Sequence, residues 1–278
     1  MNNIQITKAS GESADFEPAK LEQSLRRAGA GQHQAETITR AIEAQLREGM
    51  TTGEIYRMAK RMLRKEARHT AARYSLKRAL LDFGPSGFPF EQYIAQLLKA
   101  DGYSVEHGLL RQGHCILHEI DVLAQMDSRV VVGECKFHNR QNLVCDVKVP
   151  LYIHSRFRDL KAGFLSAPTW NGHNIESWIF TNTRFTDDAS QYGQCAGMHL
   201  VSWNWPPNGS LRDWVDRSGL HPVTCLTTLT RREKDLLLEK KVVLVRELLA
   251  NRQLLKTMRV ATGRIPRIIE EAELVCGV

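Results

Sequence analysis

The chain has 278 residues, 42% of them hydrophobic and 25% charged, which is ordinary for a soluble globular protein with a sizeable core. Lys and Arg number 38 against 31 Asp and Glu, and the net charge of +7 fits either a nucleic-acid partner or a solvated basic surface. The six Cys include no C-x-x-C pair, which disfavours a zinc ribbon and favours reduced thiols. With neither a signal-peptide region nor a membrane-length apolar run, we expect a cytoplasmic protein.

Three segments differ in their pattern, and neither an internal repeat nor a low-complexity tract is evident. In residues 1–84, apolar and polar residues alternate around Ile6 and a returning strand is predicted to end near Phe16, which indicates a small β-hairpin. A helix is predicted to begin at Pro18, and others to follow over about 38–49, after a cap at Thr51 or Thr52, and over about 70–81. This segment is therefore predicted to be a hairpin followed by a helical bundle.

The second segment, residues 88–205, follows a Gly-Pro-Ser-Gly linker and mixes both periodicities. Helices are predicted over 90–100 and 187–195, and strands at 103–105, 120–124, 130–135, 178–181 and 199–203. The third segment, residues 209–278, is basic and helical. The predicted fold class is α/β (α+β), with a central mixed β-sheet flanked by helices between two helical segments.

Charged residues interrupt two apolar strand patterns of the second segment. If the strands around Ile120 and Val132 form an antiparallel hairpin with Asp127 and Ser128 at its tip, then Asp121 lies opposite Glu134. Side chains alternate along a strand, so Lys136 and Glu119 project on the same face as this pair.

Two facing carboxylates repel each other, and a divalent cation removes that penalty. Oxygen ligands without a thiolate favour Mg²⁺ or Mn²⁺ over Zn²⁺, and such an ion polarises a phosphodiester and acidifies water. A neighbouring lysine stabilises the developing negative charge. The alternative is a surface hairpin with a carboxylate–lysine ion pair. The surrounding apolar residues read as buried, and buried charges need a partner or an ion, so the metal site is favoured.

The trio Asp121, Glu134 and Lys136 resembles the PD-(D/E)XK nuclease signature, and its surroundings are similar to the Mrr-type restriction endonucleases. "GFPFEQYIAQLLKADGYSVE" resembles the opening helix and first strand of that family, and "WIFTNTRFTDDASQYGQCAGMHLVSW" its later strand–helix–strand. The resemblance covers about Phe88 to Trp205. It implies a restriction-endonuclease-like sheet in which Asp121 and Glu134 bind the metal, Lys136 is the catalytic lysine and Glu91 is the helix acid near the metal.

One stretch departs from that family pattern. "RQGHCILHEID" replaces the usual glycine-rich approach to the aspartate, which leaves open whether Glu119, His114 or His118 enters the site. A histidine at such a place is more often structural than a metal ligand. Gln141 and Lys148 are weaker candidates, either as phosphate contacts or as plain surface residues.

The N-terminal segment resembles an ATP-cone, the nucleotide-sensing module of ribonucleotide reductases and their repressors. The resemblance rests on "ITKASGESADFEPAKLEQSLRRAG", "GMTTGEIYRMAKRML" and "ARYSLKRALLDFG". It implies that Lys8, Lys20 and Thr51 contact ATP or dATP, because ammonium groups and a helix N-terminus suit phosphates. Ala9 and Ala14 depart from the family pattern, so the alternative is a helical interaction module without a ligand.

The C-terminal segment resembles no named motif; it is expected either to hold DNA through its phosphates or to mediate dimerisation. The leading hypothesis is a metal-dependent DNA endonuclease of restriction type that ATP or dATP regulates. One competing hypothesis is a nucleotide-responsive DNA-binding regulator with an inactive nuclease fold, and another is a helical scaffold. DNA is expected from the family resemblance, and a homodimer is compatible with cutting both strands.

Overall fold

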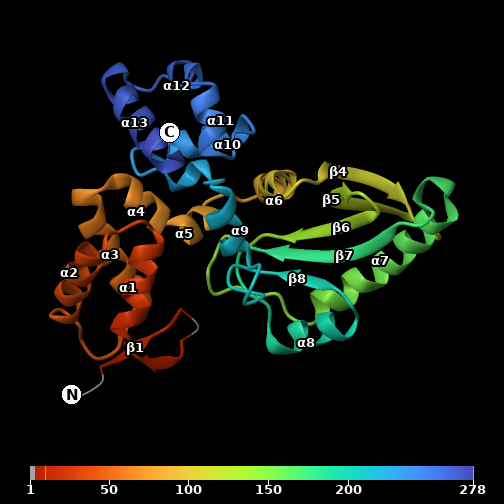
Figure 1. Cartoon of the computed structure of the whole chain (residues 1–278), viewed down its shortest axis with the longest axis horizontal. Coiled ribbons are helices and arrows are strands. Elements are labelled where there is room, and N and C mark those ends of the chain that lie inside the picture. Colours follow the sequence, from red (N-terminus) through yellow and green to blue (C-terminus); the bar gives the residue numbers. More distant parts are fainter. Residues whose placement is uncertain (1–3, 10, 278) are drawn as a thin grey trace. The chain divides into compact units, whose positions relative to one another are not determined.

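A computed structural model describes residues 4–9 and 11–277 (Figure 1). By its contacts the chain forms two compact units, one from residues 1–79 with 221–278 and the other from residues 80–220. This division differs from the three predicted segments, because the C-terminal helices join the first unit and residues 209–220 join the second. The first unit is held across its two stretches by hydrogen bonds from Thr224 Oγ1 to the Ala79 carbonyl (2.7 Å) and from Arg73 to the Val275 carbonyl (2.9 Å).

The first unit opens with a small sheet. Strand β1 (Gln5–Thr7) pairs antiparallel with β2 (Ser13–Asp15) and parallel with β3 (Met50–Thr51). The predicted hairpin is therefore confirmed, and the third strand adds the residues that lead into the following helix. Thr7 lies beside Thr51 in the register, and Ile6 lies beside Met50.

Four of the helices in this unit's first stretch pack around one apolar cluster that includes Leu25, Ile42 and Leu63, all fully buried. They are α1 (Pro18–Arg27), α2 (Gln32–Glu43), α3 (Thr52–Glu66) and α4 (Arg68–Tyr74). Thr51 caps α3 as predicted, in a capping box with Glu54. The single helix predicted over 70–81 is two helices, because Ser75 leaves the helical conformation between α4 and α5 (Leu76–Leu81).

The C-terminal stretch of this unit is helical, as predicted. After a short 3-10 turn, η2 (Val223–Cys225), it contains α10 (Arg231–Glu239), α11 (Val245–Ala250), α12 (Gln253–Thr257), η3 (Thr262–Arg264) and α13 (Ile265–Cys276). The buried carboxylate of Glu271 in α13 accepts four hydrogen bonds from the backbone and hydroxyl groups of Thr227 and Thr228. These bonds fix the loop that precedes α10.

The second unit is built on a mixed sheet with the strand order β4-β5-β6-β7-β8. The antiparallel strands are β4 (Ser104–Gln112), β5 (Leu117–Met126) and β6 (Arg129–Lys136), and β7 (Asn174–Thr181) and β8 (His199–Val201) continue parallel to β6. The predicted α/β class and the mixed sheet are confirmed. Gly133 in β6 gives room to its neighbours, because a Cβ there would lie 3.2 Å from both the Phe180 ring and the Val122 carbonyl oxygen and would force a small shift.

The register of the β5–β6 hairpin is the predicted one. Met126 pairs with Arg129 around the turn at Asp127 and Ser128, and the ladder continues to Val122 and Gly133. Asp127 takes the left-handed conformation, with φ at 52°, that such a tight turn needs. The hairpin therefore directs Asp121 and Glu134 toward the same end of the two strands.

Helices cover both faces of this sheet (Figure 1). On one face, α7 (Lys148–Ser166) packs Leu160 and Phe164 against β5 and β6, and α8 (Asp187–Cys195) covers β7 and β8. On the other, Trp214 of α9 (Leu211–Ser218) contacts Trp178 and Phe180. Helix α6 (Phe88–Ala100) packs near β4, and η1 (Pro168–Trp170) follows α7. The sequence patterns did not predict α7.

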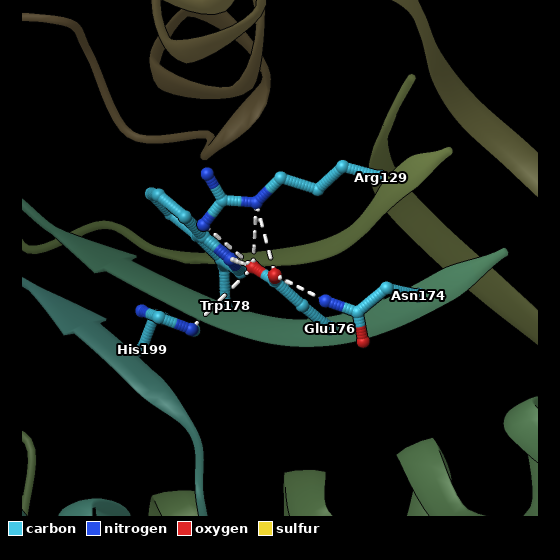
Figure 2. A network of polar contacts seen from close by, with 5 residues as sticks. All are labelled: Arg129, Asn174, Glu176, Trp178 and His199. Atoms are coloured by element: carbon cyan, nitrogen blue, oxygen red, sulfur yellow. Dashed lines mark hydrogen bonds and ion pairs between the residues drawn. The ribbon is translucent and has the colours of Figure 1, made fainter. Parts of the chain in front are cut away.

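A saturated carboxylate lies near the start of β7 (Figure 2). Glu176 accepts hydrogen bonds from Nε and Nη2 of Arg129 at 2.8–2.9 Å and from the Trp178 indole and the Asn174 amide at 2.9 Å. His199 lies 3.4 Å away. Its donors hold the pKa of Glu176 below the ordinary value despite burial, so this network serves as a structural clamp between β6 and β7.

Candidate active site at the ends of strands β5 and β6

Asp121 lies where the β5–β6 ladder ends. One carboxylate oxygen accepts the backbone N–H of Cys135 at 2.7 Å, where a further backbone pair would otherwise stand. Burial and the charge of Glu134 nevertheless raise the pKa of Asp121 to about 6, against the opposing effects of that N–H and of Lys136. Asp121 is therefore a carboxylate whose surroundings do not fully compensate its negative charge.

Glu134 lies between two cations. Its Oε1 accepts from Lys136 Nζ at 2.6 Å and its Oε2 from Arg156 Nη1 at 3.0 Å, while the residue is only 9% exposed. Burial lowers the pKa of Lys136, but Glu134 outweighs it and the net direction is upward, so the lysine is a cation. Arg156 also donates to the Glu119 carbonyl and its guanidinium lies 5.6 Å from the Tyr152 ring.

Glu91 joins this group from another element. It lies in the first turn of α6, and burial raises its pKa to about 7, with further contributions from the negative charges of Asp121, Glu119 and Glu134. The structure thus brings together the four predicted residues Asp121, Glu134, Lys136 and Glu91, and it adds the side chain of Arg156. Three carboxylates that repel one another, with two cations beside them, are suited to binding a cation or to exchanging protons.

A small cavity of about 20 Å³ adjoins Glu134, Glu119 and Arg156. Ser177 of β7 also lines it, and the hydroxyl of this 2% exposed residue has no hydrogen-bond partner among the described residues. A space of this size holds about one water molecule, and an unpaired buried hydroxyl calls for a polar occupant. The lining is mostly apolar, and its polar side chains are those of Glu119, Glu134, Arg156 and Ser177, so the cavity fits a single water molecule.

The other residues considered from sequence lie apart from this chemistry. His118 is 8% exposed and its Nε2 lies 2.8 Å from Asp159, so it is a structural histidine, as favoured. His114, Gln141 and Lys148 are exposed. Glu119 contributes its carbonyl to Arg156 and part of the cavity wall.

Across the residues that the structure describes, no group of three or more His, Cys, Asp or Glu side chains is arranged to hold a metal ion. Glu134 forms its two ion pairs with Lys136 and Arg156, and Asp121 accepts the Cys135 N–H. The same residues include no helix that is long and apolar enough to cross a membrane.

The predicted nucleotide contacts lie in the first unit. Lys8 directly follows β1 and forms an ion pair with Glu12 at 3.5 Å. Lys20, in the first turn of α1, pairs with Glu17, and the Thr51 hydroxyl exchanges hydrogen bonds with Glu54 in the cap of α3. The β1–β3 register brings the end of β1, and with it Lys8, beside Thr51.

The sequence patterns missed Arg156 and Ser177. Helix α7 had a usable signal, because its buried residues Ile153, Leu160 and Phe164 lie seven and then four residues apart, on one helical face. Ser177 carried no comparable signal, since its isolation follows only from how α7 covers the sheet.

Comparison with known proteins supports the N-terminal prediction. Residues 4–82 match the ATP cone domain, and residues 221–276 match the family described as AF1548-like, C-terminal. The first unit therefore contains an ATP-cone domain, a nucleotide-binding type of module, followed after the second unit by the AF1548-like helices.

A protein of Archaeoglobus fulgidus, described as an uncharacterized protein, is 31% identical over 186 residues, which are 66% of this chain and all of that protein. A crystal structure described as that of a protein of unknown function, AF1548, has a TM-score of 0.56 at 28% identity and covers 69% of this chain and all of that one. This chain belongs to the AF1548-like family. Because 186 aligned residues are two thirds of the 278-residue chain, the alignment includes the middle of the chain and with it strands β5 and β6.

Proposed function

We propose that this protein is a metal-dependent DNA endonuclease whose activity responds to ATP or dATP. The observation that carries the proposal is the undercompensated carboxylate group of Asp121, Glu134 and Glu91 beside Lys136. A structural ion-pair network such as that of Glu176 satisfies its carboxylate, whereas this group keeps the pKa values of Asp121 and Glu91 high. The resemblance to the Mrr-type nucleases supports phosphodiester hydrolysis as the chemistry.

The residues present fit a Mg²⁺ or Mn²⁺ ion. Asp121 and Glu134 would hold it, with Glu91 close by, and the unpaired Ser177 hydroxyl supports a polar occupant beside Glu134. Two protein carboxylates suit Mg²⁺, which usually keeps several water ligands. The ion supplies the charge that polarises a phosphodiester and acidifies water.

The remaining steps belong to the chain's own side chains. Lys136, a cation 2.6 Å from Glu134, is placed to stabilise negative charge that develops on a phosphate next to these carboxylates. Glu91, with its pKa near 7, is suited to accept and release a proton near neutral pH. Arg156 offers a second cation to the phosphate if it leaves Glu134.

A plasmid-cleavage assay tests the nuclease. Full-length protein with Mn²⁺ or Mg²⁺ is expected to convert supercoiled DNA, and Asp121→Asn and Lys136→Ala are each expected to lose about 100-fold or more of the rate. Lys99→Ala removes an exposed lysine at the end of α6 in the same unit and is the matched control, with an unchanged rate. Binding without cleavage under both metals would instead support the DNA-binding regulator with an inactive nuclease fold.

The nucleotide response is tested separately. Calorimetric titration with ATP and dATP is expected to show binding that Lys8→Ala and Lys20→Ala weaken, because each removes a cation from the ATP-cone domain. No heat with either nucleotide would retire the regulatory part and leave the nuclease part standing. A change in cleavage rate on adding ATP would join the two.

A further inference from the structure

The basic surplus of the chain is unevenly placed. Residues 80–220, which carry the candidate active site, hold 12 Lys and Arg against 15 Asp and Glu, a net charge of −3. Residues 1–79 hold 15 against 9, and residues 221–278 hold 11 against 7. Since phosphate backbones are bound through cations, most of the cationic charge that could hold DNA lies outside the active-site unit.

The C-terminal helices contain one turn twice, eighteen residues apart. At the end of α10, Lys241 N–H donates to the Leu238 carbonyl and Val242 N–H to Leu237, both at 2.9 Å. At the end of α12, Arg259 N–H donates to the Lys256 carbonyl at 2.9 Å and Val260 N–H to Leu255 at 3.0 Å. Both are Schellman turns, each closed by a buried valine over a buried leucine. The sequence does not show this repeat, because the two copies share geometry more than residues.

The residue at the centre of each turn is a cation in a left-handed conformation. Lys241 has φ at 61° and Arg259 has φ at 58°, and both residues are exposed. Elsewhere the chain uses glycine at this place, as Gly29 does after α1 and Gly197 after α8. Glycine is the common choice because a side chain is strained there. Two cations at the two equivalent places therefore have a use other than closing a helix.

A purely structural explanation for these two cations is that they stabilise the negative end of the helix dipole at each helix C-terminus. Lys240, the C-cap residue of α10, and Lys256 within α12 already supply that charge at negative φ, one and three residues earlier. The strained positions add a cation at the outward tip of each turn. Exposed cations at such tips suit an extended anion that passes over the surface, such as a chain of phosphates.

We propose that the C-terminal helices form a sequence-independent binding surface for the DNA backbone, in which Lys241 and Arg259 each contact a phosphate. The choice of DNA over other polyanions rests on the proposed function. Because binding through phosphates needs no metal and no catalysis, the surface is to be tested with the metal removed.

The test measures binding of the full-length protein to a 30-base-pair duplex in EDTA across a series of salt concentrations. The variant Lys241→Gly/Arg259→Gly is expected to bind more weakly, by roughly tenfold per turn near 0.1 M salt, and to lower the slope of log affinity against log salt by about 2. Glycine suits a left-handed φ, so the midpoint of thermal unfolding is expected to stay within about 2 °C of the parent's or to rise.

A control variant, Lys65→Gln/Lys99→Gln, removes the same charge from exposed helical positions elsewhere and is expected to leave the salt slope within about 0.5 of the parent's. Unchanged binding by the glycine variant, or a loss equal to the control's, would overturn the proposal. The proposal would also be overturned if the glycine variant kept its binding to the duplex but lost binding to anionic phosphatidylserine vesicles, because that result would assign the surface to a membrane. If the parent protein binds the duplex in EDTA but does not cleave plasmid DNA with Mn²⁺ or Mg²⁺, the result counts against the proposed nuclease and leaves the binding surface standing.

Discussion

Glu176 and the group around Asp121 lie near opposite ends of neighbouring strands in one sheet, and they differ in how their charge is compensated. Glu176 accepts from a bidentate arginine, an indole and an amide, and its pKa is lowered (Figure 2). The Asp121 carboxylate accepts the Cys135 backbone N–H, lies near the carboxylates of Glu134 and Glu91, and has its pKa raised. Both are acids in an apolar sheet, yet only Glu176 has its negative charge compensated by surrounding hydrogen-bond donors.

The difference teaches how to recognise a working site among buried acids. Burial costs any carboxylate free energy, and a fold that needs the acid only for stability surrounds it with donors. A buried carboxylate with too few hydrogen-bond donors lowers the stability of the fold unless a bound partner compensates its charge.

The largest effect is expected when Glu176 is removed. Glu176→Ala leaves the Arg129 guanidinium and the Trp178 N–H without their acceptor, and we expect a loss of about 2–3 kcal/mol of unfolding free energy in chemical denaturation. Glu106→Ala, which breaks an exposed 3.5 Å pair with Arg111, is the control and should change stability by less than about 0.5 kcal/mol. Equal effects for the two variants would remove the distinction between a saturated network and a surface ion pair.

A smaller effect of opposite sign is expected at Asp121. Its pKa is about 6 in the folded chain and about 3.9 when unfolded, so the folded form binds more protons between these values. Stability from this group is therefore fully present below pH 4 and is lost as pH rises through 6. Asn keeps an acceptor for the Cys135 N–H without the charge.

Asp121→Asn should accordingly be more stable than the parent at pH 8 by about 1–2 kcal/mol, after allowing for solvent access, although cleavage is lost. Denaturation at pH 4 and pH 8, in EDTA, measures it, and the gain should vanish at pH 4. A variant that is destabilised at both pH values would show that Asp121 is a structural acid like Glu176.

The smallest effect concerns Arg156, which holds Glu134 in the absence of a metal ion. Arg156→Ala removes the cation that competes with Mn²⁺ for Glu134. It should tighten Mn²⁺ binding by about three- to tenfold in calorimetry, since a single partly buried ion pair is lost. Arg158→Ala, an exposed arginine on the same helix, is the matched control. Weaker Mn²⁺ binding in Arg156→Ala would mean that the guanidinium positions Glu134 for the ion and does not compete with it.

Patterns of neighbouring residues in the sequence predicted much of the fold. The tight turn at Asp127 fixed the β5–β6 register, the Thr51 cap fixed the start of α3, and α8 lies over the predicted range. These features depend on neighbours in the chain, which is why the residue pattern predicts them. The trio of Asp121, Glu134 and Lys136 followed from the register together with a family resemblance.

What the sequence could not supply depends on contacts between distant elements. The spacing of the buried residues could have located α7, but the contact of Arg156 with Glu134 follows only from how that helix packs on the sheet. Asp121 leaves the ladder because the Cys135 N–H turns to its carboxylate, which no pairing rule anticipates. The joining of residues 221–278 to residues 1–79 likewise has no local signal, since it rests on bonds such as that of Thr224 to Ala79.

That discontinuous unit has a consequence for synthesis. Residues 80–220 leave the ribosome between the two stretches of the first unit, at about 5–20 residues per second, so a delay of about 7–30 s separates Ala79 from its partner Thr224. During that time the second unit can complete its sheet, while the face of α4 that receives α13 stays uncovered. The candidate active site is thus assembled before the unit that carries the basic surplus and the ATP-cone is complete.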